Sequence, residues 1–359
     1  MMKKVVFFLL FLLSISSQLT YGQLRSYSNE FLALGIGARG LAMGNVQSAT
    51  VGDVTAAYWN PAGLNNVEDL QIGIQHAEWF AGIGKYDYVG LAAPIGYGER
   101  AIGISIIRFG VDDIPNTLNI IDPTGNVDYD RLTTFSAADY AVLLSYAQEI
   151  KNLRVGGNVK IIHRKVGGFA NSWGFGLDLG AQYDVSDNFT LGATVRDLTT
   201  TPNLWSFSFT EEEKEILEST DNIIPSSSVE LTGPRLILGG AWKTNMGKSD
   251  QLSLLIAADI DLTFEERNTL VHTGFVSIDP HLGFELGYDE LVYFRAGVNN
   301  VQRFLDDNDP TKEVLSLQPN VGLGLNFGIF TVDYALTGFS NLGSGLYSNV
   351  VSLKLDFKK

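Results

Sequence analysis

Hydrophobic and polar residues alternate with a period of two along much of the chain. In residues 173–183, one parity holds Trp, Phe, Leu, Leu, Ala and Tyr, whereas the other holds Gly, Gly, Asp, Gly and Gln. The same alternation appears in 189–196, 319–327 and 350–357. Because successive side chains of a β-strand point to opposite faces, this period predicts strands whose two faces meet different surroundings.

Alternating runs that are bounded by clusters of Gly, Pro, Asn and Asp predict fourteen strands. Residues 269–278 are a candidate for a further strand, but an odd total would leave the C-terminus on the outer side of a barrel. The fourteen predicted strands cover 70–79, 86–95, 100–110, 136–148, 153–166, 171–184, 189–199, 234–243, 251–264, 281–288, 291–301, 317–327, 329–338 and 347–357.

The predicted connections fall into two classes of length. An even number of strands, with short turns at one rim and long loops at the other, predicts an all-β fold, a transmembrane antiparallel barrel of the bacterial outer membrane. The alternative is a soluble periplasmic β domain, since the strands of a sandwich also alternate. The short connections are 96–99, 149–152, 184–188, 289–290 and 328, and the long ones are 111–135, 200–233, 265–280 and 302–316.

Hydropathy supports the barrel. After residue 22 no uninterrupted apolar stretch reaches the length of a membrane-spanning helix, and the mean hydropathy of +0.09 is low for a helical bundle in lipid. Backbone amides in hydrocarbon must all be paired, so strands that cross a bilayer must close into a barrel.

The N-terminus has the pattern of a secretory signal peptide in residues 1–22. Lys3 and Lys4 precede an apolar run, Val5–Leu13, and the segment ends at Gly22, after which we expect cleavage. The alternative, a permanent N-terminal anchor, would need about twenty apolar residues, and this run has about nine. The chain is therefore expected to be exported and to reside in the outer membrane.

Composition excludes several classes of function. The chain has 25 basic and 40 acidic residues and a net charge of -15, so nucleic acid would be repelled. It has no Cys, so thiolate metal sites, disulfides and a lipid anchor at the cleavage site are excluded. The four His are scattered and no G-x-S-x-G motif is present, so we expect neither an enzyme nor a cofactor or metal.

Residues 23–66, between the signal peptide and the predicted barrel of 67–359, contain a formal G-x-G-x-x-G at 35–40. A dinucleotide site is not expected, because no strand precedes the motif and no βαβ unit follows it. The glycines instead suit a chain that bends tightly inside or beneath a barrel.

The segment 31–66 resembles the PorV/PorQ family of outer-membrane proteins of the type IX secretion system, which are similar to the FadL fatty-acid transporter barrels. The resemblance implies a hatch that blocks the lumen of a barrel with fourteen strands. The alternative is that Asn60 and Pro61 only cap a turn. Besides Phe31, Leu32, Ala38, Ala42, Met43 and Leu64, the matching residues are those of the implied hatch motif: Gly37, Arg39, Gly44, Asp53, Trp59, Asn60, Pro61, Ala62 and Gly63.

Two functions from different classes are compatible with the sequence. The resemblance implies an accessory of type IX secretion that binds secreted proteins or other components of the system, such as the translocon barrel, through its long outer loops. The alternative is a FadL-like transporter of a hydrophobic small molecule, gated at Asn60–Gly63. Under both functions, the barrel is also expected to contact outer-membrane lipid.

The loop 200–233 holds the candidate partner-binding residues. Thr210 and Glu213 are spaced as a capping box, which predicts a short helix at the rim. The alternative is a solvated acidic turn. The candidate residues are Glu211, Glu212, Glu213, Ile216 and Leu217.

Charged residues also occur on the inward parity of the predicted strands, and we expect most of them to pair across a wet lumen. Residues 306–309 form an acidic run, but they lack the spaced ligands of a Ca²⁺ loop and are expected to be solvated. The inward polar residues are Arg154, Asn158, Lys160, Asp178, Arg196, Asp333, Lys354 and Asp356.

Overall fold

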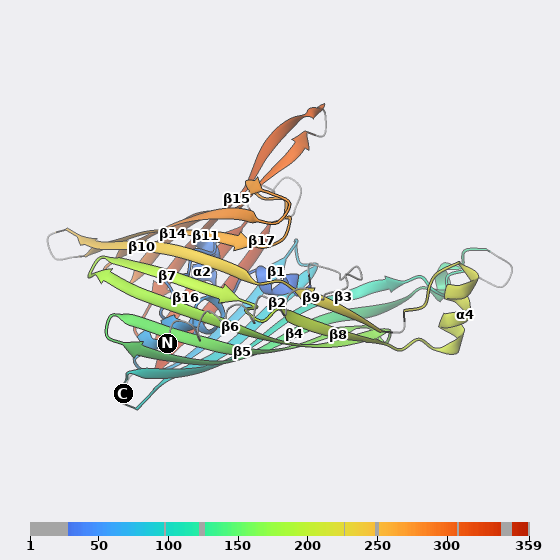
Figure 1. The fold of residues 1–359 in the computed structure, drawn as a ribbon, viewed down its shortest axis with the longest axis horizontal. Helices are drawn as coiled ribbons and strands as arrows, with labels where there is room; N and C mark the ends of the chain where they lie inside the picture. The colour runs from blue at the N-terminus through green and yellow to red at the C-terminus, as the bar shows by residue number, and fades with distance from the viewer. Residues whose placement is uncertain are drawn as a thin grey trace, which may run out of the picture.

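The computed structural model describes residues 28–96, 98–121, 126–225, 227–247, 251–306, 309–338 and 347–357. The predicted signal peptide and its cleavage site lie outside these residues. Fourteen antiparallel strands close into a barrel, because β17 pairs with β1 as well as with β16 (Figure 1). The predicted fold class is confirmed.

Each of the fourteen wall strands overlaps one predicted strand. In order round the wall they are β1 (Leu70–Trp79), β2 (Gly84–Ile95), β3 (Arg100–Asn116), β4 (Thr133–Ile150), β5 (Leu153–Val166), β6 (Ala170–Ser186), β7 (Phe189–Arg196), β10 (Arg235–Met246), β11 (Leu252–Thr263), β13 (Ser277–Tyr288), β14 (Val292–Asp306), β15 (Asp309–Asn326), β16 (Phe330–Thr337) and β17 (Ser348–Phe357). Several of them, such as β3, β14 and β15, are longer than predicted.

Three shorter strands lie outside this ring. β8 (Thr201–Phe207) and β9 (Ser227–Thr232) form a hairpin, and β8 pairs with residues 170–174 at the start of β6. β12 (Val271–His272) pairs with the start of β13. The further strand considered at 269–278 is thus only a two-residue bridge followed by the beginning of a wall strand, and the wall keeps its even number.

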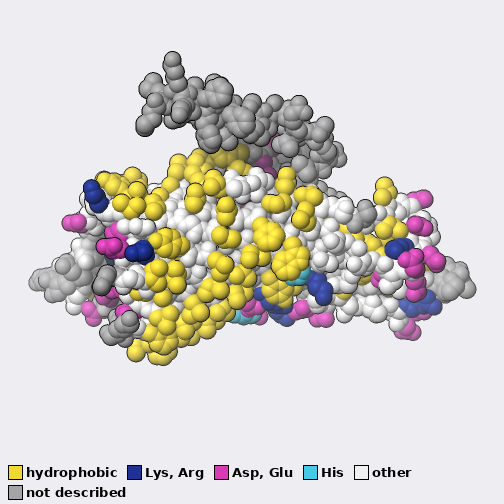
Figure 2. Space-filling view, turned by 60° about the horizontal axis from the view of Figure 1, so that its bottom comes forward, with side chains coloured by type: hydrophobic (Ala, Val, Ile, Leu, Met, Phe, Trp, Pro, Cys, Tyr) yellow, Lys and Arg dark blue, Asp and Glu magenta, His cyan; other side chains and the backbone are white. Residues whose placement is uncertain are grey.

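The alternation in sequence becomes an apolar outer face and a small or polar inner face. On β6, Phe175, Leu177 and Leu179 are exposed, whereas Asp178 and Gln182 are buried. Figure 2 shows hydrophobic side chains over the middle of one face and charged side chains toward both ends. This arrangement suits a wall that faces lipid. Among the described residues, no helix has the length and apolar composition needed to cross a membrane.

Two predicted loops are partly or mostly strand. β3 continues to Asn116 and β4 begins at Thr133, so the loop expected at 111–135 is shortened at both ends to 117–132. The loop expected at 302–316 is wrong: β14 and β15 continue through it as a hairpin that bends away from the barrel (Figure 1). Residues 312–317 are exposed on both parities. A hairpin without a buried face has no period of two, which is why the pattern missed it.

The described residues before β1 lie against the inner wall of the barrel. This luminal segment, residues 28–66, contains η1 (Glu30–Ala33), α2 (Ala38–Ala42), α3 (Ala56–Trp59) and η2 (Pro61–Asn66). α2 contacts β14 to β17, and η2 contacts β3 to β6. The main hydrophobic core lies between the luminal segment and the wall, with Ile36, Leu41 and Leu64 almost fully buried.

Candidate functional site

The luminal segment approaches the wall at glycine positions. A Cβ added to Gly192 of β7 would lie 2.2 Å from the Ser48 carbonyl oxygen, and one added to Gly297 of β14 would lie 2.2 Å from the Met43 carbonyl carbon. Real Cβ atoms do not come so close to backbone, so only glycine fits at these inward positions. A Cβ would also lie under 3 Å from the luminal segment at Gly156, Gly180, Gly283 and Gly322.

Asn60 joins the luminal segment to the wall. Its side-chain nitrogen donates to the carbonyl oxygens of Ser48 (2.7 Å) and of Ala181 on β6 (3.0 Å). Its side-chain oxygen accepts from the Ala62 amide at 3.1 Å, and Pro61 begins η2. Asn60 therefore caps a turn, but it does not only cap a turn, since the same side chain also binds a wall strand.

Other residues of the implied hatch motif pack within the luminal segment or against the wall. The indole nitrogen of Trp59 donates to the Ile36 carbonyl oxygen at 3.0 Å. A Cβ on Gly63 would lie 2.4 Å from the Val51 carbonyl oxygen. Gly37 and Gly44 have φ angles of 75° and 66°, which favour glycine. These residues meet in one structure, but their role as a hatch stays a prediction.

Arg39 anchors α2 to the wall through ion pairs. Its guanidinium lies 2.8 Å from the Glu285 carboxylate of β13. Glu285 also pairs with Arg295 at 2.6 Å, and Arg295 pairs with Asp333 at 2.6 Å. Glu285 and Arg295 are the two wall residues around Arg39, and neither of them was predicted from the sequence. Both lie inside strands predicted at 281–288 and 291–301, so their inward parity was the available signal.

Asp53 has a local and a wall partner. Its carboxylate accepts from the Thr55 amide (2.9 Å) and hydroxyl (2.6 Å) and lies 3.9 Å from the Lys354 ammonium of β17. Burial raises the pKa of the Asp53 carboxyl, but the charge of Lys354 and the bonds from Thr55 outweigh burial, so this pKa lies below its ordinary value. Asp53 is therefore a carboxylate.

A second ionic cluster lies on the opposite side of the lumen. Lys160 of β5 pairs with Asp178 at 3.0 Å and with Asp197 at 2.7 Å. Arg196 of β7 donates to the Tyr58 carbonyl oxygen at 3.0 Å, and its guanidinium carbon lies 4.4 Å from the centre of the Tyr58 ring. Inward charges thus pair with each other and with the luminal segment, as expected.

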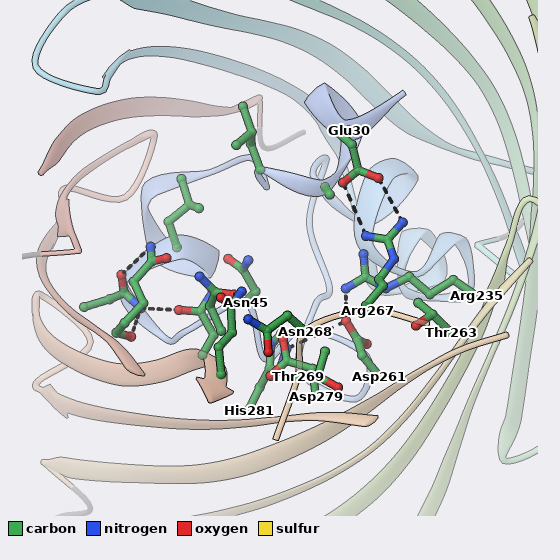
Figure 3. Close-up of a pocket in the computed structure, with 18 of the residues that line it drawn as sticks. Glu30, Asn45, Arg235, Asp261, Thr263, Arg267, Asn268, Thr269, Asp279 and His281 are labelled. Atoms are coloured by element: carbon green, nitrogen blue, oxygen red, sulfur yellow. Dashed lines mark hydrogen bonds and ion pairs between the residues drawn. The ribbon is translucent and has the colours of Figure 1, made fainter. Parts of the chain in front are cut away.

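Two cavities lie on either side of one stretch of the luminal segment. The upper cavity, of about 730 Å³, lies toward the long loops and includes Leu41 in its lining, together with Asn45, which is labelled in Figure 3. The lower cavity, of about 340 Å³, lies toward the short turns and includes Gly40 and Gln47. The stretch 37–48, which contains α2, therefore separates them.

The separating stretch is also held by backbone bonds to the wall. The buried Asp259 carboxylate of β11 accepts from the amides of Gln47 and Ser48, both at 2.9 Å. The wall itself is interrupted beside the upper cavity. The ladder between β13 and β14 ends at the pair Leu282–Val298, and β14 then bends away.

The candidate partner-binding residues lie far from both cavities. Thr210 and Glu213 form the predicted capping box at the start of α4 (Glu211–Ser219). This helix lies at the far end of the molecule, beside the extended strands (Figure 1). Glu211 and Glu212 are exposed, whereas Glu213, Ile216 and Leu217 are half-buried. A role of α4 in binding a partner stays a prediction.

Metal binding finds no support in the described part of the chain. No group of three or more His, Asp or Glu residues there is arranged to hold an ion. Asp307 and Asn308, the centre of the acidic run considered for Ca²⁺, lie outside the described residues.

Comparison with known proteins identifies the fold. No family model and no curated protein matches the sequence. Among solved structures, the CymD monoaromatic hydrocarbon channel covers 91% of this chain and 98% of its own, with a TM-score of 0.56 and 13% identity. The Pseudomonas putida toluene transporter TodX covers 90% and 98%, with a TM-score of 0.56 and 14% identity. The fold is that of the FadL-like barrels.

A Pseudomonas aeruginosa FadL homologue is also similar, with a TM-score of 0.51 and 14% identity over 89% of this chain and 98% of that one. These likenesses concern the fold. Two of the three neighbours are named as a channel or a transporter, and none is named as an enzyme. Membership of the PorV/PorQ family stays a prediction.

Proposed function

We propose that this chain is an outer-membrane channel that passes a small molecule through its lumen when the stretch 37–48 is displaced. The observation that carries the proposal is the pair of cavities above and below this stretch. Structural likeness to a hydrocarbon channel and a toluene transporter supports it. The alternative carried from the sequence, FadL-like transport, therefore takes precedence over the secretion role.

The two short helices of the luminal segment lie differently with respect to the cavities. α2 and η2 each contact four wall strands, β14 to β17 and β3 to β6 respectively. The stretch that contains α2 lines both cavities, with Leu41 and Asn45 on the upper side and Gly40 and Gln47 on the lower side. The linings of the two cavities include no residue of η2. We therefore assign the movement to 37–48 rather than to the gate expected at Asn60–Gly63.

Permeability of liposomes tests the channel. Purified full-length protein is reconstituted, and entry of small uncharged solutes is compared with protein-free liposomes and with protein lacking residues 28–48. Faster entry than in protein-free liposomes, and faster still with the deletion, is expected. If neither protein raises entry above the protein-free rate, the channel proposal is wrong.

The secretion role remains a second candidate because one feature favours a surface partner. β3 to β6, together with β8, β9 and α4, extend well beyond the end of the wall (Figure 1), and Glu211 and Glu212 of α4 are exposed. A channel alone does not require such an extension. Secreted proteins or other components of the type IX system are the partners that the sequence resemblance implies.

A further inference from the structure

Most of the residues that line the upper cavity have polar or charged side chains. Most small-molecule pockets are lined mainly by apolar side chains with few polar groups. Here sixteen of the twenty lining residues have polar or charged side chains, and seven of the twenty are carboxamides, of which Figure 3 labels Asn45 and Asn268. A hydrocarbon in this cavity would offer no hydrogen bond to those amides that have no partner among the described residues, which is unfavourable. The amides include Asn45, Asn268, Asn299, Asn300, Gln302 and Asn320.

The charges of the lining are compensated by one another. Arg235 pairs with Asp261, and Arg267 pairs with Glu30 at 2.9 Å. The Asp279 carboxylate lies 3.2 Å from the His281 ring and accepts from a backbone amide. Because the guanidinium groups already have carboxylate partners, an anionic ligand would gain little from them. An uncharged ligand suits this balance best.

Two amides are left without partners. Asn45, from the luminal segment, and Asn268, from the chain after β11, form no side-chain hydrogen bond with any described residue. Both are labelled among the side chains that surround the cavity in Figure 3. An amide offers donors and an acceptor, and a hydroxyl group can match either, since it both donates and accepts.

Part of the lining is apolar. Leu34, Leu41 and Trp79 contribute to it. A sugar has hydroxyl groups together with faces of C–H groups, so it can match both the amides and this apolar part. The volume of about 730 Å³ lies within the range of about 300 to 1,000 Å³ that is common for small-molecule sites.

We propose that the upper cavity binds an uncharged, hydroxyl-rich small molecule of the size of a mono- or disaccharide. This inference rests on the proposed channel function and names the class of its solute. It differs from the hydrophobic solute of the FadL-like alternative, and the polar side chains of the lining are the reason for the difference.

Binding is tested by calorimetry on the full mature protein in lipid nanodiscs, which avoids sugar-based detergents. The probes are maltose and N-acetylglucosamine, with toluene and laurate as apolar probes. Saturable binding of a saccharide is expected, weakened about three- to ten-fold by Asn45→Gly and by Asn268→Ala, as for loss of one hydrogen bond. Glycine is chosen at position 45 because it adopts the φ of 67° there without strain.

Asn152→Gly, in an exposed short turn, is the matched control and should bind as the unmodified protein does. Binding of toluene or laurate without binding of either saccharide would overturn the inference, as would absence of all binding. Liposome entry separates the two proposals. If solutes still enter but no saccharide binds, the channel stands and the solute class is wrong. If a saccharide binds but nothing enters, the site stands and the channel is wrong.

Discussion

Arg39 of α2 donates two hydrogen bonds to Glu285 of β13, from Nε to Oε2 at 2.8 Å and from Nη2 to Oε1 at 3.3 Å. The two residues are 246 positions apart in the sequence. Their side chains are only 24% and 12% exposed, so the pair is largely shielded from water. It ties the stretch between the two cavities to the barrel wall.

Glu285→Gln should loosen this attachment. Loss of a hydrogen-bonded charge partner costs about 1.5–3 kcal/mol. We expect the barrel to assemble, because the strand ladders are unchanged, and entry of small solutes into liposomes to increase. Glu290→Gln is the matched control, since Glu290 also lines the lower cavity but forms no ion pair in the described structure. Equal entry through both variants would show that the Arg39 pair does not restrain the stretch 37–48.

Gly192→Ala should displace the luminal segment. The new Cβ would lie 2.2 Å from the Ser48 carbonyl oxygen, and such overpacking costs about 1–3 kcal/mol. Gly240→Ala, on the neighbouring strand, is the control, because its Cβ would find its nearest atom at 3.5 Å. The measurement is the temperature at which each barrel loses its compact form on an SDS gel, and this temperature should be lower for Gly192→Ala than for Gly240→Ala. A higher temperature for Gly192→Ala would mean that the luminal segment does not lie against Gly192.

The apolar outer face predicts a sharp difference between two arginine substitutions. Leu323→Arg, on the exposed face of β15, should cost roughly 2–4 kcal/mol near the bilayer midplane and impair assembly. Asn326→Arg places the same side chain toward the lower cavity and should assemble. Assembly is measured as the fraction of heat-modifiable protein in outer membranes. Impaired assembly of the Asn326 variant alone would mean that the inner and outer faces are reversed.

Deletion of 209–225 tests the surface-partner candidate. It removes α4 but leaves the β8–β9 ladder, whose last pair is Ser206 and Ser227. The barrel should fold, since surface insertions contribute little to a core. If the chain docks secreted proteins through this helix, fewer of them should co-purify with the variant from native membranes. Unchanged recovery would remove α4 from the secretion candidate.

The sequence is sufficient to predict the wall but not what fills it. Strand positions follow from alternation, because lipid and lumen impose different residues on the two faces, as at Leu177 and Asp178. The hairpin of 302–316 was missed because no buried face imposes that period. Candidate residues of 31–66 were found by resemblance, and their contacts were not.

Contacts between the luminal segment and the wall join residues far apart in the chain, such as Arg39 with Glu285 and Ser48 with Gly192. Parity shows that a residue points inward, but it does not show which part of the luminal segment the residue meets. The cavities are the space left by these long-range contacts, so they follow only from the assembled structure.

The most direct measurement is solute entry through a barrel whose stretch 37–48 is fastened covalently to the wall. Because the chain has no Cys, Arg39→Cys with Glu285→Cys offers a single pair of thiols, and both positions line the lower cavity. A short bifunctional thiol reagent with a reducible link joins the two residues in liposomes, and each single variant controls for modification without cross-linking. The account predicts that entry is fast before cross-linking, stops after it and returns on reduction. Entry that is unchanged by the cross-link would contradict a channel opened by displacement of this stretch.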